Sequence, residues 1–178
     1  MYSSRAGAKL EFALSQFNVS VDNLTCADLG CSTGGFTDCL LQHGAAKVYA
    51  VDTGYGVLDY KLRKSPKVVV MERTNAMHVV LPELVDLVTV DVSWTPQKLI
   101  LPHAKSLLKP EGFIISLIKP HYEAKNPYLS PEASLEVAEN IKQDIKNSGF
   151  KIIGFIPSPI LGEKGGNTEF LIYLKMIY

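Results

Sequence analysis

Short runs of apolar residues recur along the chain, and polar turns or segments with helical periodicity separate them. The runs have the length of β-strands and fall far short of the roughly 20 residues that a membrane-spanning helix needs. The pattern therefore predicts seven strands, at residues 24–30, 47–52, 68–72, 87–92, 113–118, 151–156 and 169–176.

The segments between these strands predict helices. Residues 35–42, 95–109 and 131–148 have helical patterns, and Ser130 followed by Pro131 is a typical helix start, with an N-cap and a proline at the first helical position. A short capped helix is also predicted within residues 1–23, ahead of the first strand. Because strands that alternate with helices form βαβ units, the sequence predicts an α/β fold with a mostly parallel sheet and helices on both faces.

The composition is typical of one globular domain, with 178 residues of which 47% are hydrophobic and 20% charged. The 18 basic and 18 acidic residues cancel. This balance argues against a protein that holds nucleic acid by bulk charge, but it leaves a local basic patch open. The N-terminus has no apolar signal core, and Cys26, Cys31 and Cys39 show no Cys-x-x-Cys spacing. We therefore predict a cytoplasmic protein with free thiols, no metal site and no membrane contact.

The turn after the first predicted strand is the candidate ligand-binding loop, because ligands of open α/β sheets lie at the carboxyl ends of the strands. It reads Asp-Leu-Gly-Cys-Ser-Thr-Gly-Gly-Phe-Thr-Asp over residues 28–38. The phosphate-binding string Gly-x-x-x-x-Gly-Lys-Ser/Thr does not occur in the sequence. A dinucleotide fingerprint would place its glycines at Gly30, Ser32 and Gly35, and the middle one, which makes room for a pyrophosphate, is a serine.

S-adenosyl-L-methionine fits this loop better, because it carries no phosphate and its amino and sulfonium groups are cationic. The carboxylate of Asp28 would attract such a ligand, and Asp52, at the end of the second strand, lies where an acidic residue accepts both ribose hydroxyls. In a simpler interpretation both aspartates cap the next segments and the glycines only form a tight turn. The predicted cofactor contacts are Asp28, Gly30, Ser32, Thr33, Gly34, Gly35, Phe36, Asp52, Asn75 and Asp91.

Several motifs, taken in order, resemble the TlyA branch of the FtsJ-like ribose 2′-O-methyltransferases. The glycine-rich turn is followed by Val-Asp-Thr-Gly-Tyr-Gly at 51–56, Glu-Arg-Thr-Asn at 72–75 and Asp-Val-Ser at 91–93. Ser-Arg-Ala-Gly-Ala-Lys-Leu at 4–10 is similar to the family's N-terminal helix, and Ile-Lys-Pro at 118–120 and Asn-Thr-Glu-Phe-Leu at 167–171 match its later motifs. The resemblance covers essentially the whole chain, so we expect residues 1–178 to form one FtsJ-like methyltransferase domain.

This resemblance implies a Rossmann-like, S-adenosylmethionine-dependent methyltransferase fold whose seven-stranded, mostly parallel sheet has an antiparallel last strand. It implies methylation of cytidine ribose, with ribosomal RNA or a ribosomal subunit, and no DNA, as the partner. By motif position the family's catalytic set carries over onto Lys9, Asp91, Lys119 and Glu169, and Arg5 resembles an RNA-contacting position.

Methylation of a ribose hydroxyl needs such a set, because the hydroxyl is a weak nucleophile and must lose its proton as it attacks the methyl group. Lys119 follows an apolar strand, so burial would lower its pKa towards that of a useful base, whereas neighbouring carboxylates would keep it protonated. The sequence leaves both effects open. Asp91 and Glu169 would orient Lys119, and Lys9 would help to hold the hydroxyl or its developing negative charge.

Other residues are weaker candidates. Trp94 follows the Asp-Val-Ser motif and is a candidate for the substrate mouth, while the four histidines show no ligand spacing and receive no role. Asn75, after the third strand, would meet the adenine edge of the cofactor or serve as a turn residue. A dense basic cluster, which would track phosphates or form a solvated loop, consists of Lys61, Arg63, Lys64 and Lys67 beside Tyr60.

Two features depart from the TlyA pattern. Those proteins usually carry an N-terminal S4-type RNA-binding module, which this sequence does not show, and residues 121–131 lack the glycine-rich basic stretch expected after the fifth strand. We therefore expect weak, salt-sensitive RNA binding. Two alternatives stay open: a methyltransferase that acts on another substrate, and a cofactor-binding or assembly module with weak or no catalysis, which includes the hemolysin-type description.

Overall fold

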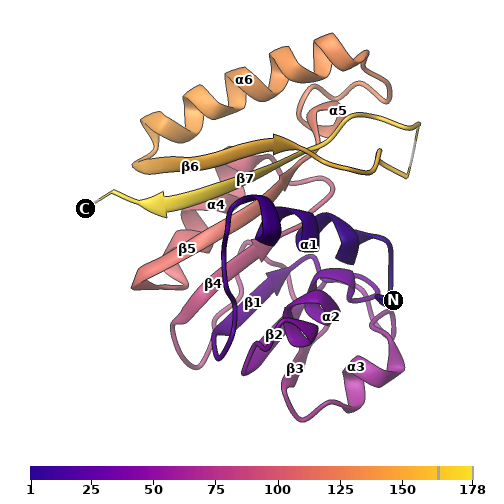
Figure 1. Cartoon of the computed structure of the whole chain (residues 1–178), viewed down its shortest axis with the longest axis vertical. Coiled ribbons are helices and arrows are strands. Elements are labelled where there is room, and N and C mark those ends of the chain that lie inside the picture. The colour runs from indigo at the N-terminus through magenta and orange to yellow at the C-terminus, as the bar shows by residue number, and fades with distance from the viewer. Residues whose placement is uncertain (164, 178) are drawn as a thin grey trace.

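The computed structural model describes residues 1–163 and 165–177, and one seven-stranded sheet runs through them. The strand order is β3-β2-β1-β4-β5-β7-β6, and β7 alone runs antiparallel to its neighbours (Figure 1). The predicted α/β fold, with a mostly parallel sheet and an antiparallel last strand, is confirmed. The strands are β1 (Thr25–Leu29), β2 (Lys47–Val51), β3 (Val68–Met71), β4 (Val85–Val90), β5 (Leu108–Ile118), β6 (Phe150–Pro157) and β7 (Phe170–Met176).

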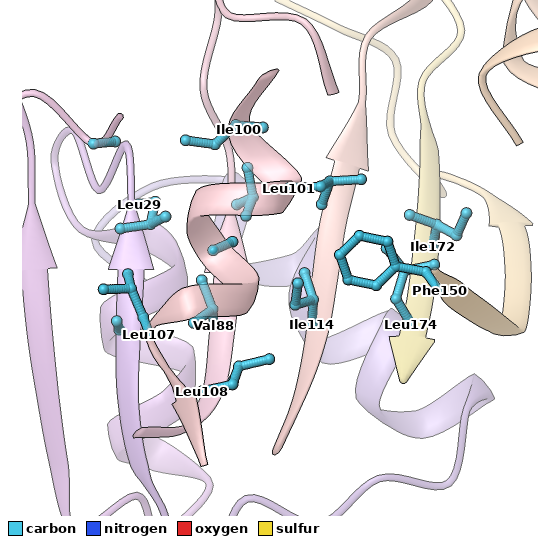
Figure 2. Close-up of a cluster of buried hydrophobic side chains, with 14 of the residues drawn as sticks. Leu29, Val88, Ile100, Leu101, Leu107, Leu108, Ile114, Phe150, Ile172 and Leu174 are labelled. Atoms are coloured by element: carbon cyan, nitrogen blue, oxygen red, sulfur yellow. The ribbon is translucent and has the colours of Figure 1, made fainter. Parts of the chain in front are cut away.

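Helices cover both faces of this sheet. One hydrophobic core lies between the sheet and the helices α4 and α6, and Figure 2 shows Ile100 and Leu101 of α4 among the sheet residues Leu29, Val88 and Ile114. A second core lies on the other face, beneath α1 and α2, and a smaller one lies beneath α3. The helices are α1 (Ala6–Gln16), α2 (Gly35–Gln42), α3 (Tyr60–Lys64), α4 (Gln97–Ser106), α5 (Pro120–Glu123) and α6 (Pro131–Asn147).

The predicted start of the helix at Ser130 and Pro131 is confirmed, whereas the N-cap residue of α1, Arg5, makes no side-chain cap hydrogen bond. Ser130 caps α6, because its hydroxyl accepts a hydrogen bond from the Ala133 backbone N–H at 3.2 Å. The helix within residues 1–23 forms as α1, where the Ser4 hydroxyl accepts a hydrogen bond from the Ala6 backbone N–H.

The predicted helix at 95–109 is wrong at its C-terminal end, since α4 stops at Ser106 and β5 begins at Leu108. Pro110 explains the difference: a residue that precedes proline is pushed towards extended backbone, so Lys109 leaves the helix. Leu108 then pairs with Val85 as a strand residue.

Three further observations concern membranes, metals and thiols. None of the helices in the described part of the chain is long and apolar enough to cross a membrane. Among the same residues there is no group of three or more His, Cys, Asp or Glu side chains placed to hold a metal ion. Cys26, Cys31 and Cys39 are free thiols, and all three are buried.

Candidate active site

A pocket of about 460 Å³ opens at the carboxyl edge of the parallel strands, beside β1 and β4, where the order of the strands reverses. This volume lies in the range of small-molecule sites. Its walls come from the start of α1, the loop between β1 and α2, the ends of β4 and β5, the short helix α5 and the segment before β7. The fold therefore gathers segments from both ends of the chain around one cavity.

The loop between β1 and α2 follows a path that only glycine permits at two positions. Gly30 has a φ of +83°, and a Cβ there would lie 2.6 Å from the backbone oxygen of Asp91. Gly34 has a φ of +98° directly before α2. At Gly35 a Cβ would lie 2.9 Å from the backbone nitrogen of Gly7. The glycines thus let the loop pass close to the end of β4 and to the start of α1, as the sequence predicted for a ligand-binding turn.

Asp28 lies beneath this loop and has no exposed surface. Its two carboxylate oxygens accept hydrogen bonds from the hydroxyls of Thr37, at 2.7 Å, and Thr89, at 3.0 Å. Burial raises the pKa of Asp28 to about 7, although these hydrogen bonds act in the opposite direction. Asp28 therefore joins the loop to the sheet from below, and its side chain does not line the pocket.

Asp52 also holds the loop. One carboxylate oxygen accepts a hydrogen bond from the Ser32 backbone N–H at 2.8 Å, and the other accepts one from the Gly54 backbone N–H at 2.7 Å. This side chain fixes Ser32 in its left-handed conformation, with a φ of +49°. A carboxylate has further lone pairs, so contact with ribose hydroxyls stays a prediction for Asp52.

Two ion pairs stand at the other end of the pocket. Lys119, at the end of β5, lies with its Nζ 2.6 Å from Oδ1 of Asp91, which follows the adjacent strand β4. Lys9 of α1 donates a hydrogen bond of 2.5 Å to Oε2 of Glu169, and both side chains are almost fully buried. Because β7 is antiparallel, its first residue pairs with Ile118, which brings Glu169 beside Lys119. The four residues of the predicted catalytic set line one pocket.

The protonation of Lys119 follows from its neighbours. Burial lowers the pKa of Lys119, but the ion pair with Asp91 and the nearby charge of Glu169 outweigh it, and the pKa stays above its usual value. Of the two effects that the sequence left open, the attraction by the carboxylates is the stronger. Lys119 is therefore protonated at neutral pH in this structure.

Aromatic side chains flank Lys119. Trp94 is exposed at 81% and meets Tyr122 edge-on, with ring centroids 4.8 Å apart. Tyr122 in turn packs against the ring of His121, and both of these residues line the pocket. Sequence reasoning gave no role to His121. The one signal for it was its place two residues after Lys119, where Pro120 turns the chain into α5.

The structure brings together ten of the predicted site residues in the pocket wall, and it leaves four outside it. Asp28, Gly34 and Asp52 shape the loop, and Asn75 is exposed, where its side chain accepts a hydrogen bond from the Met77 backbone N–H. The ten pocket residues are Arg5, Lys9, Gly30, Ser32, Thr33, Gly35, Phe36, Asp91, Lys119 and Glu169.

The predicted RNA contacts lie around this pocket. Arg5 stands at its rim, where the guanidinium donates hydrogen bonds of 3.1 Å to Glu163 and to the backbone oxygen of Leu161. The basic cluster at 61–67 is centred on the helix α3 and is not a loop for most of its length, and whether it tracks phosphates or is only solvated stays a prediction. Within the cluster Arg63 forms an ion pair with Glu72, and the exposed lysines are Lys61, Lys64 and Lys67.

These features define a class of protein. A seven-stranded sheet with β7 antiparallel, and a glycine-lined pocket at the β1–β4 crossover, are the architecture of the S-adenosylmethionine-dependent methyltransferases. The structure of one such enzyme from Mesorhizobium loti superposes with a TM-score of 0.68 at 16% identity, over 95% of this chain and 98% of that one.

The particular family follows from the sequence. Residues 2–176 match the model of the FtsJ-like methyltransferase family, and the chain belongs to that family. The 16S/23S rRNA (cytidine-2′-O)-methyltransferase TlyA of Mycobacterium tuberculosis is 37% identical over 97% of this chain and 68% of its own length. Hemolysin A of Brachyspira hyodysenteriae is 40% identical over 97% of this chain and 76% of its own length.

Two further relatives show how much of a longer protein this chain matches. YqxC of Bacillus subtilis, a presumed rRNA methyltransferase, is 41% identical over 97% of this chain, and the chain spans 65% of that protein. A presumed hemolysin from Streptococcus thermophilus superposes with a TM-score of 0.92 at 38% identity, over 99% of this chain and 67% of that one.

The family and the fold identify the cofactor as S-adenosyl-L-methionine. The residues present fit this group. The segment 30–36 offers glycines, two hydroxyl side chains and no lysine or arginine, which suits a cationic ligand without phosphate. Asp91, the partner of Lys119, supplies a carboxylate to the wall of the same pocket as segment 30–36.

Proposed function

We propose that this chain is an RNA methyltransferase that uses S-adenosyl-L-methionine to methylate the 2′-hydroxyl of cytidine in ribosomal RNA. The observation that carries the proposal is the pair of lysine–carboxylate ion pairs, Lys119–Asp91 and Lys9–Glu169, in one pocket with the glycine-rich loop. The names of the TlyA and YqxC relatives support the substrate class. The proposal treats residues 1–178 as one methyltransferase domain, with 1–23 as its N-terminal helix and lead-in.

The cofactor, when bound, supplies an electrophilic methyl group on a sulfonium. The residues of the glycine-rich loop hold it at one end of the pocket, and a ribose hydroxyl enters at the other end, between the two ion pairs. Lys119 and Lys9 are the cationic donors that orient this hydroxyl and stabilise the negative charge that develops on its oxygen. Asp91 and Glu169 fix the two ammonium groups, because each lysine is held by a short contact to its carboxylate.

Lys119 is the candidate base, because its Nζ accepts the hydroxyl proton only in the neutral form of the side chain. Because its pKa is raised by Asp91 and Glu169, only a small fraction of Lys119 is neutral at pH 7. If Lys119 is the base, the rate should therefore rise about tenfold per pH unit through the neutral and mildly alkaline range. A rate that is flat over this range would assign Lys119 to electrostatic stabilisation alone.

The RNA contacts of the chain would be weak by themselves. Arg5 forms an ion pair with Glu163 at the pocket rim. The basic cluster contributes three exposed lysines, but the net charge of the whole chain is zero. Binding through such a patch falls steeply with salt. We place the protein in the cytoplasm, where ribosomal RNA is found.

Calorimetry with S-adenosyl-L-methionine, followed by transfer of a labelled methyl group to ribosomal RNA, tests the proposal. We expect cofactor binding by the wild-type protein and by Lys119→Ala, and loss of methyl transfer by Lys119→Ala. Lys146→Ala, an exposed position on α6, is the matched control and should transfer at the wild-type rate. Binding without transfer to any RNA would instead support a cofactor-binding or assembly module with weak or no catalysis.

A further inference from the structure

Hydrogen bonds hold the backbone around His121 in place. It is the second residue of α5, which starts at Pro120 directly after Lys119. The backbone oxygen of His121 accepts a hydrogen bond from the Asn126 N–H, and Glu123 of the same helix accepts one from the Gln97 backbone N–H at 2.7 Å. The position of His121 relative to Lys119 is therefore fixed by α5 itself.

The side chain of His121 has a polar atom without a partner. The residue is only 6% exposed, it lines the pocket, and its ring packs against Tyr122 with centroids 4.4 Å apart. Nδ1 is fully buried and has no hydrogen-bond partner among residues 1–163 and 165–177. A buried N–H without an acceptor is destabilising, and an unpaired acceptor is tolerated more often. The proton of the neutral ring therefore belongs on Nε2.

The charges around His121 keep the ring neutral. Burial, followed by the positive charges of Lys119 and Lys9, lowers the pKa of His121 below its ordinary value. The carboxylates of Asp91 and Glu169 face the same pocket, and each is paired with its own lysine. The other titratable groups of the pocket wall are the phenol of Tyr122, the thiol of Cys31 and the Arg5–Glu163 ion pair at the rim. A neutral ring with its proton on Nε2 is a hydrogen-bond donor that adds no charge to a pocket that must accept a cationic cofactor.

We propose that His121 is a substrate-contacting residue, whose Nε2–H donates a hydrogen bond to a ribose oxygen of the nucleotide that is methylated. This inference rests on the proposed function. The ribose is the partner because His121 stands beside the two lysines that meet the hydroxyl, on α5, whereas the cofactor is held by the loop between β1 and α2. The contact would fix the orientation of the sugar relative to the ammonium group of Lys119.

Three substitutions separate this role from a packing role. His121→Phe keeps an aromatic ring against Tyr122 and removes both nitrogens. His121→Gln places an amide N–H near the position of Nε2, whereas the shorter His121→Asn places it near Nδ1. His78→Gln, at an exposed histidine, is the control. For each variant we would measure kcat/KM with ribosomal RNA, the cofactor Kd by calorimetry, and the melting temperature.

The hydrogen bond predicts that His121→Phe and His121→Asn lose on the order of tenfold in kcat/KM for RNA, with the cofactor Kd unchanged. His121→Gln should keep most of the activity. His121→Phe should melt no lower than the wild-type protein, because it removes an unpaired buried nitrogen. Equal activity of the Phe and Gln variants, or a loss that appears in the cofactor Kd, would overturn the inference.

The pH profile gives an independent readout. Below the pKa of His121 the wild-type ring gains a third positive charge beside Lys9 and Lys119 and a buried, unpaired Nδ1–H. The ratio of wild-type to His121→Gln activity should therefore be constant above the ordinary imidazole pKa of about 6.5 and fall at a pH below it. A ratio that is constant down to the pH at which the protein unfolds would contradict the inference. A wild-type protein that binds the cofactor but transfers no methyl group to RNA would overturn the proposed function, and the inference with it.

Discussion

Replacement of Asp28 by asparagine tests how the buried carboxylate beneath the glycine-rich loop is held. Burial raises the pKa of Asp28 from 3.8 to about 7, so the folded protein binds the proton more tightly than the unfolded chain. The stability that this protonation contributes is complete below pH 3.8 and is lost as the pH rises through 7. The full pKa shift corresponds to about 4 kcal/mol of stability, of which about 3 kcal/mol is lost between pH 5 and pH 8.5.

Asparagine has the shape of a protonated aspartate, and the hydroxyls of Thr37 and Thr89 can each donate or accept a hydrogen bond. The free energy of unfolding of Asp28→Asn, relative to the wild-type protein, should therefore increase by about 3 kcal/mol between pH 5 and pH 8.5. Denaturant titrations of both proteins at the two pH values measure this difference. A difference that does not change with pH would refute the reasoning, because it would mean that the two hydroxyls keep Asp28 ionised throughout.

Three further predictions concern the second ion pair, the loop and the basic cluster. Lys9→Met should lower the free energy of unfolding by about 3–5 kcal/mol, because it leaves Glu169 buried without its partner. Adding Glu169→Gln to this variant should recover most of the loss. A Lys9→Met protein as stable as the wild-type protein would contradict this prediction. Gly35→Ala should weaken cofactor binding in calorimetry by on the order of tenfold, because a Cβ there collides with the start of α1. An unchanged Kd would show that α1 shifts without moving the loop. Lys64→Ala should reduce the slope of log K against log salt for RNA binding by about 1, whereas Lys146→Ala should leave the slope unchanged. Equal slopes in the two variants would show that RNA does not bind to the basic cluster.

The sequence predicted that the residues of the proposed catalytic set lie close together, because strand ends can be located from apolar runs. Asp91 and Lys119 follow neighbouring parallel strands, and parallel strands end at the same edge of a sheet. The position of Glu169 depended on the antiparallel β7, which the resemblance supplied. The way these residues pair was beyond the sequence, since Lys9 comes from a helix 160 residues away from Glu169 in the chain.

Other parts of the site depended on packing that no local pattern encodes. The carboxyl end of β1 predicts that Asp28 lies near the ligand, but only the fold shows that Thr37 and Thr89 enclose its side chain beneath the loop. The helix α5 has four residues, too few for a helical period to be recognised. The sequence signal for His121 was therefore its place two residues after Lys119, since the four histidines show no metal-ligand spacing.

The proposed function assigns to this pocket the transfer of a methyl group to a ribose hydroxyl. Its most direct test is mass-spectrometric analysis of the nucleosides in ribosomal RNA after incubation with the wild-type protein and isotope-labelled S-adenosyl-L-methionine. We expect labelled 2′-O-methylcytidine, and its loss with Lys119→Ala. A label found on a base, or 2′-O-methylcytidine formed equally by Lys119→Ala, would contradict it.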